Sequence, residues 1–199
     1  MIGDLMRELT YYVAASLDGF IAATDGTFDA FLAEGDHMEA VVSDYADALP
    51  AHVLNALGIE PPRTRFDTVI QGWNSYSVAL DVGITNPYSH LAEYVATHRT
   101  DEPSGVTYTS DALATVRTLK AQPGLGMYLC GGGSLAGSLL PEIDRLIIKS
   151  NPVVLGAGIP LFGGVAVAPV GFALQSAWTF ASGVTITEYA RPAPQLHEV

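Results

Sequence analysis

The stretch that decides the fold of this chain is residues 126–162, GMYLCGGGSLAGSLLPEIDRLIIKSNPVVLGAGIPLF. The apolar run Met127–Cys130 is typical of a buried strand, and Gly131, Gly132 and Gly133 follow it directly. Leucines at helical spacing then predict a helix over residues 134–140. Glycine lets a backbone approach an anion closely, and the start of a helix offers unpaired N–H groups and a partial positive charge. The order of strand, glycines and helix therefore predicts a phosphate site.

The same glycines also have a purely structural interpretation, in which they form a tight turn and let the helix pack closely on the sheet. The segment does not match G-x-G-x-x-G, because Ser134, Leu135 and Ala136 follow Gly133. It does not match the P-loop pattern either, because no lysine follows the glycines. Taken alone, the glycines leave both interpretations open.

Two further segments point to a known family. A second strand is predicted over Asp144–Ser150, extended or followed by residues 152–155, and the opening run Tyr11–Ala22 reads YYVAASLDGFIA. Together with the glycine segment, these runs resemble the dihydrofolate-reductase-like superfamily, and within it the reductase domain of riboflavin biosynthesis. The resemblance is good at these two ends, passable through the middle and poor over residues 24–65. It implies a reductase that uses a nicotinamide cofactor.

The opening strand has an implied role as the floor between cofactor and substrate. By resemblance, Ala14 and Ala15 face the nicotinamide, and Ala15 and Asp18 border the substrate. Asp18 has an alternative as an ordinary turn residue, because Asp18-Gly19 is a common turn pair.

A second order of strand, glycine and helix starts at Phe66–Gln71 and continues through Gly72, Trp73, Asn74 and Ser75. The resembled family has Gly-Arg-x-Thr-Tyr here and holds cofactor phosphates with it, so Trp73 replaces the usual arginine. The alternative is an ordinary helix capped by Asn74 or Ser75.

A strand over residues 92–97 ends in His98-Arg99, where the family has Ser-Arg facing the adenosine ribose. The alternative for Arg99 is a surface charge on a loop. The resemblance thus implies one set of cofactor-binding residues: Ala14, Gly72, Trp73, Asn74, Ser75, His98, Arg99, Gly131, Gly132, Gly133, Ser134 and Leu135.

Composition narrows the class of protein. The chain has 199 residues, 49% of them hydrophobic and 15% charged, so one globular domain over residues 1–199 is expected. The net charge of −12 argues against nucleic acid or an anionic membrane as a partner. Cys130 is the single cysteine and is expected to be a buried core thiol. The scattered His37, His52, His90 and His98 predict no metal site. Without an apolar leader or a membrane-length run, a cytoplasmic enzyme is expected.

The remaining elements complete an α/β pattern. Helices are predicted over residues 29–49, 51–57 and 111–122, the last capped by Ser110, with a hairpin from 172–180 and 184–189. Residues 1–8 and 191–199 are expected to be loose ends, and the variable segment 24–65 to shape the substrate pocket. We therefore predict a three-layer α/β domain like dihydrofolate reductase, with a mixed, mostly parallel sheet and a C-terminal antiparallel hairpin.

The predicted function is hydride transfer from NADPH, with NADH possible, to a pterin-like or pyrimidine-like heterocycle. The alternatives are a nucleotide-binding module without turnover and a phosphate-ester hydrolase, and the lack of a clustered acidic metal site argues against the hydrolase. No residue is assigned as the proton donor; Asp29, Asp36 and water are candidates. The resemblance also implies a homodimer that contacts through the hairpin and residues 159–162.

Overall fold

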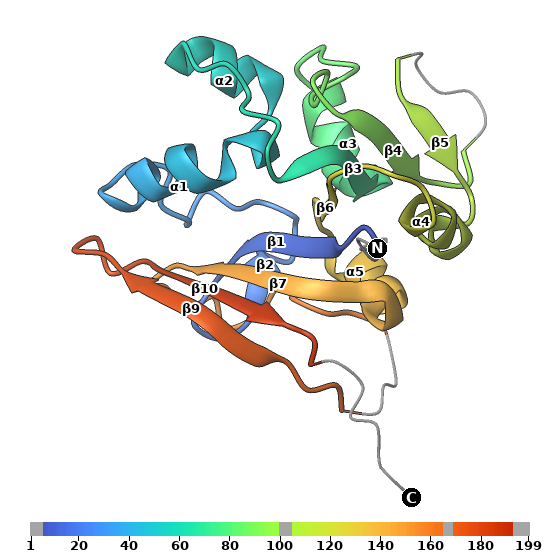
Figure 1. Cartoon of the computed structure of the whole chain (residues 1–199). Helices are drawn as coiled ribbons and strands as arrows, with labels where there is room; N and C mark the ends of the chain where they lie inside the picture. The colour runs from blue at the N-terminus through green and yellow to red at the C-terminus, as the bar shows by residue number, and fades with distance from the viewer. Residues whose placement is uncertain (1–5, 100–104, 165–168, 193–199) are drawn as a thin grey trace, which may run out of the picture.

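The computed structural model describes residues 6–99, 105–164 and 169–192, and its centre is an eight-stranded sheet (Figure 1). The strands run in the order β5-β4-β3-β6-β1-β7-β10-β9. Every pairing is parallel except those of β10 with β7 and with β9. The strands are β1 (Leu9–Ala15), β3 (Phe66–Gly72), β4 (Ala92–Ala96), β5 (Thr107–Thr109), β6 (Gly126–Leu129), β7 (Ile143–Ser150), β9 (Ala173–Thr179) and β10 (Thr185–Ala190). The predicted mixed sheet with a C-terminal hairpin is confirmed.

Helices cover both faces of this sheet, which gives the predicted three layers. Figure 1 shows α1 and α2 above the sheet, and α4 and α5 on the opposite side. The helices are α1 (His37–Tyr45), α2 (Ala51–Leu57), α3 (Trp73–Leu80), α4 (Ala112–Lys120) and α5 (Gly133–Leu139). Two short 3-10 turns, Ala46–Ala48 and Leu140–Glu142, follow α1 and α5, and β2 (Phe20–Ala22) pairs separately with β8 (Ile159–Pro160).

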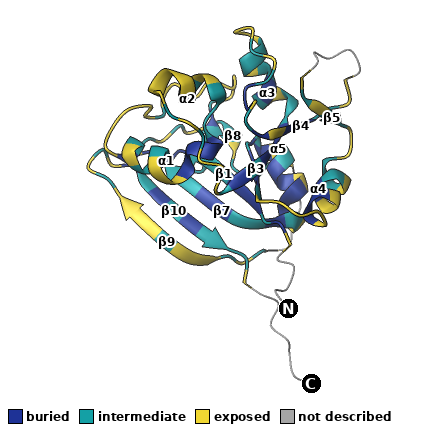
Figure 2. Cartoon of the chain, turned by 45° about the horizontal axis from the view of Figure 1, so that its top comes forward, coloured by how far each residue is buried: buried dark blue, intermediate teal, exposed yellow. Residues whose placement is uncertain are grey.

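The alternation of side chains along each strand builds two cores (Figure 2). On the face of α4 and α5, Leu9 and Tyr11 pack with strand residues of β6 and with Val116 and Leu139. On the face of α1, Ile147 and Ile186 pack with Val41, Tyr45 and the half-buried Tyr12. Each buried Val, Leu or Ile side chain contributes about 1.5–3 kcal/mol, so both helix layers are held by the sheet.

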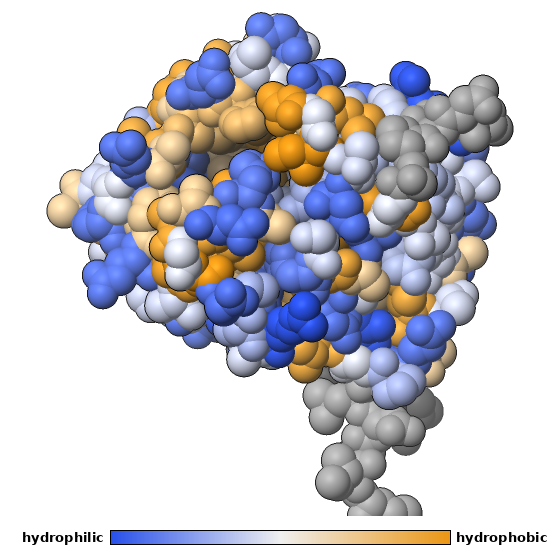
Figure 3. Space-filling model, turned by 90° about the horizontal axis from the view of Figure 1, so that it is seen from above, coloured by the Kyte–Doolittle hydropathy of each residue, from blue (hydrophilic) through white to orange (hydrophobic). Residues whose placement is uncertain are grey.

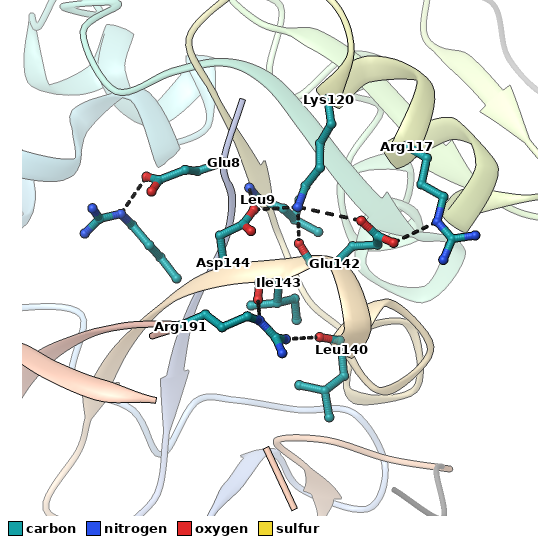
Figure 4. Close-up of polar contacts among 10 residues, drawn as sticks. Glu8, Leu9, Arg117, Lys120, Leu140, Glu142, Ile143, Asp144 and Arg191 are labelled. Atoms are coloured by element: carbon teal, nitrogen blue, oxygen red, sulfur yellow. Dashed lines mark hydrogen bonds and ion pairs between the residues drawn. The ribbon is translucent and has the colours of Figure 1, made fainter. Parts of the chain in front are cut away.

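A polar network fixes the amino end of β7 (Figure 4). Lys120 of α4 pairs with Asp144 at 2.6 Å and with Glu142 at 3.7 Å, and Arg117 pairs with Glu142 at 2.7 Å. The Asp144 carboxylate also accepts the backbone N–H of Leu9 at 2.8 Å. Because a slip of one residue would turn each side chain to the other face, these contacts help to set the β1–β7 register.

Several predicted boundaries are wrong for identifiable reasons. The first helix begins at His37 instead of residue 29, because Gly35 has φ +137° and the Asp36 carboxylate accepts the N–H groups of Ala181 and Ser182 in the hairpin turn. Ser110 is not the cap of α4; Asp111 accepts the N–H of Ala114 at 2.9 Å. Of the two alternatives for residues 152–155, the structure supports the one in which they follow the strand, because β7 ends at Ser150.

The two chain ends are better anchored than predicted where they are described. Arg7 is buried and pairs with Asp67 and with the Thr68 hydroxyl. Arg191 donates to the carbonyls of Ile143 and Leu140 at 2.9 and 2.6 Å. Residues 1–5 and 193–199 lie outside the described residues.

Candidate functional site

Two turns of the order strand, glycine and helix meet at the carboxyl edge of the sheet. They connect β3 to α3 and β6 to α5, and β3 and β6 are neighbours. The Gly72 N–H donates to the Gly131 carbonyl at 3.4 Å. The Ser75 hydroxyl lies next to both Gly131 and Gly132. A Cβ atom added to Gly131 would be 3.9 Å from the hydroxyl oxygen, and one added to Gly132 would be 4.0 Å from it. Residues that the sequence could only place in two separate motifs therefore form one surface.

Both helices begin at this surface without a side-chain cap. The residues that precede them are Gly72 and Gly132, which have no side chain to cap the helix, and among the described residues neither helix start has a side-chain cap hydrogen bond. The alternative in which Asn74 or Ser75 caps α3 is therefore wrong, because both lie inside the helix. Uncapped first-turn N–H groups at two adjacent helix starts favour an anionic group such as a phosphate.

Each of the three consecutive glycines has a different local environment, and the structural consequence of glycine differs at each position. Gly131 has φ +73°, a left-handed conformation that favours glycine, and its peptide bond to Gly132 is cis. Gly133 has no space for a side chain, because a Cβ atom would lie 2.0 Å from the Pro160 carbonyl oxygen. Gly132 faces open space apart from Ser75. The close-packing interpretation thus applies to Gly133, and the room for a ligand is at Gly132.

The residues after the glycines differ in exposure. Ser134 is exposed on the first turn of α5. Leu135 is half-buried, packs against the core, and its Cδ2 atom would lie 3.8 Å from a Cβ atom at Gly72. Leu135 therefore joins the two turns by an apolar contact.

The structure brings Trp73 and Arg99 together. The Arg99 guanidinium lies over the Trp73 ring, 4.2 Å from its centroid, and the ring also packs edge-on against Tyr76. Arg99 and His98 are both exposed after β4. The unusual tryptophan thus holds, by a cation–π contact, the arginine that the sequence places near the cofactor.

The end of β1 contributes small residues to the same edge. Ala15 is buried and its carbonyl accepts the N–H of Asn151 at 2.8 Å, and Ala14 is half-buried. The Asp18 carboxylate accepts the Ser16 hydroxyl at 2.6 Å and the N–H groups of Leu155 and Gly156 at 3.1 and 2.7 Å. These contacts, first the one from Ser16, lower the pKa of Asp18. Its observed role is to brace the turn, and its substrate contact stays a prediction.

Two side chains at the end of β7 were missed by the sequence analysis. The Lys149 ammonium donates to the Leu32 carbonyl at 2.8 Å, and the buried Asn151 side chain accepts the Leu32 N–H at 3.0 Å. Both backbone groups of Leu32 are therefore held, which fixes the loop between β2 and α1 at the carboxyl edge. A lysine at the end of a strand and an asparagine just after it give no local signal of this contact, because Leu32 is far away in the chain.

The face that carries α1 and α2 is hollowed between apolar side chains (Figure 3). Cys130, the residue after β6, is half-buried and bonds with the Tyr88 hydroxyl at 3.2 Å, and burial raises the pKa of its thiol. Tyr12, Tyr88 and Tyr128 pack around this thiol. The expected core thiol is thus only partly buried, at the end of the strand that leads to the glycines.

The candidate acids are held elsewhere. α1 buries His37, Val41 and Tyr45 but none of its carboxylates among the described residues. The Asp36 carboxylate binds the hairpin turn, and Asp29 is exposed before α1. Asp47 accepts four backbone N–H groups, those of residues 63–66. Neither Asp29 nor Asp36 is positioned as a proton donor by any contact in the structure.

Glu93 is a buried carboxyl whose ionisation should affect stability. It accepts from the Gln71 amide at 2.5 Å and from the Tyr88 N–H at 3.1 Å, and burial raises its pKa to about 7. The unfolded chain loses the Glu93 proton at lower pH than the folded chain does. The stabilising contribution of protonated Glu93 to the free energy of unfolding is therefore full below the unfolded pKa and is lost as pH rises through about 7. The change amounts to roughly 3 kcal/mol.

We therefore expect Glu93→Gln to gain stability relative to the parent as pH rises from 4.5 to 8. Urea unfolding at several pH values measures this, and comparing pH values cancels the fixed cost of the altered hydrogen bonds. Glu39→Gln, an exposed change on α1, is the control. If the free energies of unfolding of the parent and of Glu93→Gln changed with pH in parallel, the prediction would be contradicted.

Within residues 6–99, 105–164 and 169–192, no three His, Cys, Asp or Glu side chains lie close enough to share a metal ion. In the same described part of the chain, no helix is long and apolar enough to cross a membrane.

The strand order, the terminal hairpin and the paired glycine turns define a dihydrofolate-reductase-like domain. The dihydrofolate reductase of Enterococcus faecalis superposes with a TM-score of 0.62 at 15% identity, covering 95% of this chain and 99% of that one. A Shewanella protein described as a riboflavin biosynthesis protein superposes with a TM-score of 0.69 at 22% identity, covering 94% and 99%.

Sequence comparison gives the family. Residues 7–186 match the RibD C-terminal domain, so the chain belongs to the RibD C-terminal domain family. It is also 34% identical over 164 residues to the uncharacterized protein YwjB of Bacillus subtilis, covering 78% of this chain and 83% of that protein. The resemblance stated from the sequence is confirmed.

Proposed function

We propose that this protein is an NADPH-dependent reductase that transfers a hydride to a pterin-like or pyrimidine-like heterocycle. The observation that carries the proposal is the meeting of two uncapped helix starts at Gly72 and Gly131–Gly132, in a chain of the RibD C-terminal domain family. Together these features suit the phosphates of a nucleotide cofactor.

The proposed cofactor site follows the carboxyl edge. The N–H groups in the first turns of α3 and α5, which follow Gly72 and Gly132, hold the phosphates together with the Ser75 hydroxyl beside Gly131, and Trp73 with Arg99 receives the adenosine end. Ala14 and Ala15 leave the floor at the end of β1 free of bulk. The bound nicotinamide supplies the hydride, and the protein supplies position and electrostatics.

The test begins with binding and then asks for turnover. Titration of the parent with NADPH is expected to quench protein fluorescence, and Gly132→Asp is expected to lose this binding while keeping the parent's circular dichroism, because a carboxylate would meet the phosphates. Gly132→Ala is the matched control for adding a Cβ atom. NADPH oxidation is then followed with 7,8-dihydropterin and an aminopyrimidinone as acceptors. A folded Gly132→Asp that binds NADPH like the parent would contradict the proposed site.

A nucleotide-binding module without turnover is the second candidate. It is favoured by one observation, that the candidate acids Asp29 and Asp36 are not directed at the site. NADPH binding without oxidation by any acceptor would select it.

Arg99 should read the 2′-phosphate that distinguishes NADPH from NADH. One charged hydrogen bond from a guanidinium contributes about 1.5–3 kcal/mol, or roughly tenfold to a hundredfold in affinity. We expect Arg99→Ala to weaken the binding of NADPH by that factor and the binding of NADH much less, because Trp73 would still stack on the adenine of either cofactor. Arg117→Ala on exposed α4 is the control. An unchanged ratio of the two dissociation constants would show that Arg99 does not contact the phosphate.

The proposal includes a homodimer in the cytoplasm, where an unpaired thiol such as Cys130 stays reduced. Residues 150–187 contain no charged side chain in a chain of net charge −12, so copies of the chain repel least there. β9 is an edge strand with Leu174 and Trp178 exposed, whereas Phe162 packs on Tyr11 in the core. Light scattering at micromolar concentration is expected to give twice the chain mass for the parent and the single mass for Leu174→Glu. A monomeric parent would contradict it.

A further inference from the structure

We propose that Lys149 donates the proton that accompanies hydride transfer and is therefore a catalytic residue. This inference rests on the proposed reductase function. Reduction of a C=N bond needs a hydride on carbon and a proton on nitrogen, and the described part of α1 buries no carboxylate that could supply the proton. Lys149 is an ionisable side chain beside the proposed nicotinamide floor.

The register of the sheet places Lys149 there. Lys149 of β7 pairs in parallel with Ala14 of β1, and neighbouring strands lie about 4.8 Å apart. Lys149 is two residues beyond Ile147, and Ala14 is two beyond Tyr12, so both point to the face of α1. The lysine stem thus leaves the sheet beside Ala14, on the hollowed side of the molecule.

The ammonium of Lys149 has capacity left for a ligand. It donates one hydrogen bond, to the Leu32 carbonyl, out of three available N–H groups. No carboxylate lies within ion-pair distance of it among the described residues, whereas Lys120 pairs with both Glu142 and Asp144. In a chain with 21 acidic residues, a half-buried lysine that has no acidic partner among the described residues is available to an electron-rich substrate.

The surroundings of Lys149 favour release of a proton. Burial lowers its pKa, because the charged form is less well solvated there. Lys149 has four neighbours to consider. The side chains of Ala14, Ile186 and Leu32 do not ionise, whereas the imidazole of His37 in α1 can. Burial and then the charge of Lys149 lower the pKa of His37, so His37 is neutral at neutral pH.

Other ionisable groups at this edge are less suited. The pKa of Asp36 is lowered by hydrogen bonds, first from the Ser182 side chain, so it is ionised and holds no proton. The Cys130 thiol has a raised pKa and bonds with the Tyr88 hydroxyl, so it gives up its proton reluctantly.

The step balances with the cofactor as reductant. As the hydride of NADPH forms a C–H bond at the carbon of C=N, the π electron pair moves to nitrogen, which takes a proton from the Lys149 ammonium. One N–H bond forms on the substrate, one Nζ–H bond breaks, and NADPH leaves as NADP⁺. Neutral Lys149 regains its proton from solvent.

The chain has only two lysines, which gives a direct spectroscopic test. Reductive ¹³C-methylation labels Lys120, Lys149 and the amino terminus and keeps their charge, and Lys149→Gln assigns the Lys149 signal. We expect NADP⁺, with its positive nicotinamide, to shift the Lys149 signal and lower its pKa more than NADPH does, with Lys120 unchanged. Bound NADP⁺ that leaves the Lys149 signal unmoved overturns the inference, and failure of both cofactors to bind overturns the proposed function instead.

Turnover separates the proton from the charge. With whichever of 7,8-dihydropterin and the aminopyrimidinone the parent reduces, Lys149→Gln and Lys149→Arg are both expected to lose at least about a hundredfold in kcat, with the NADPH dissociation constant unchanged. Arginine keeps the charge but does not release a proton. The parent's kcat should fall as pH rises through the pKa measured for Lys149, and Cys130→Ser should retain activity. Near-parent kcat in Lys149→Arg overturns the donor role, and a parent that reduces neither acceptor overturns donor and reductase together.

Discussion

Gly133→Ala is expected to abolish folding or to cost on the order of 4 kcal/mol or more. The added Cβ atom would lie 2.0 Å from the Pro160 carbonyl oxygen and 3.2 Å from its carbon. Both obstacles are backbone atoms, and the Gly163 N–H already bonds to the Gly133 carbonyl at 2.9 Å. Neither the backbone at Gly133 nor the segment over residues 160–163 can move away without breaking this hydrogen bond.

The adjacent glycine provides the control. A Cβ atom at Gly132 meets only the Ser75 hydroxyl, at 4.0 Å, and the backbone there has φ −68°. Gly132→Ala should therefore unfold in urea close to the parent's midpoint, while Gly133→Ala should yield little soluble protein or a much lower midpoint. Equal midpoints for the two variants would show that the approach of residues 160–163 is looser than the structure indicates.

Asp47→Ala is expected to lose roughly 3 kcal/mol or more of unfolding free energy. The buried carboxylate accepts the N–H groups of Arg63, Thr64, Arg65 and Phe66 at 2.7–3.2 Å. Its removal leaves these donors unpaired at the entrance to β3, where water reaches only the exposed ones. For a domain of this size, the loss corresponds to a drop of roughly 6–12 °C in Tm.

Asp47→Asn sharpens this test, because its amide keeps one oxygen as an acceptor but would place an NH2 donor against the N–H group that bonds to the other carboxylate oxygen. It should recover only part of the loss. Asp44→Asn on the exposed side of α1 makes the same chemical change and should have a Tm within about 2 °C of the parent. A Tm for Asp47→Ala near that of Asp44→Asn would show that the loop over residues 58–65 folds without the carboxylate.

Much of the fold was predictable because its signals are local. Glycines after apolar runs marked both helix starts, Gly72 and Gly131–Gly133, and the predicted hairpin is present as β9 and β10. The errors also have local causes. The Asp36 carboxylate bonds to a turn 145 residues away, which the residues around Asp36 do not indicate. Asp111 caps α4 instead of Ser110, and the sequence could not decide between them because both residue types favour that position.

The candidate site was predictable in part. The sequence named Trp73 and Arg99 separately, and the order of β3 and β4 in the sheet brings them into a cation–π contact. It missed Lys149, because a lysine at the end of a strand carries no signal of the residue beside it. The cofactor contacts of the named residues stay predictions that the Gly132 and Arg99 variants test.

The sequence by itself determined the order of elements, the family and the two glycine turns, because periodicity and backbone freedom depend on residues close together in the chain. Only the tertiary structure decided that Gly133 serves packing, that Asp47 supports the start of β3, and that Lys149 stands beside Ala14. The physical reason is that these contacts join residues about 20 to 135 positions apart. They depend on strand order, register and the face to which each side chain points, which a local pattern of residue types does not specify.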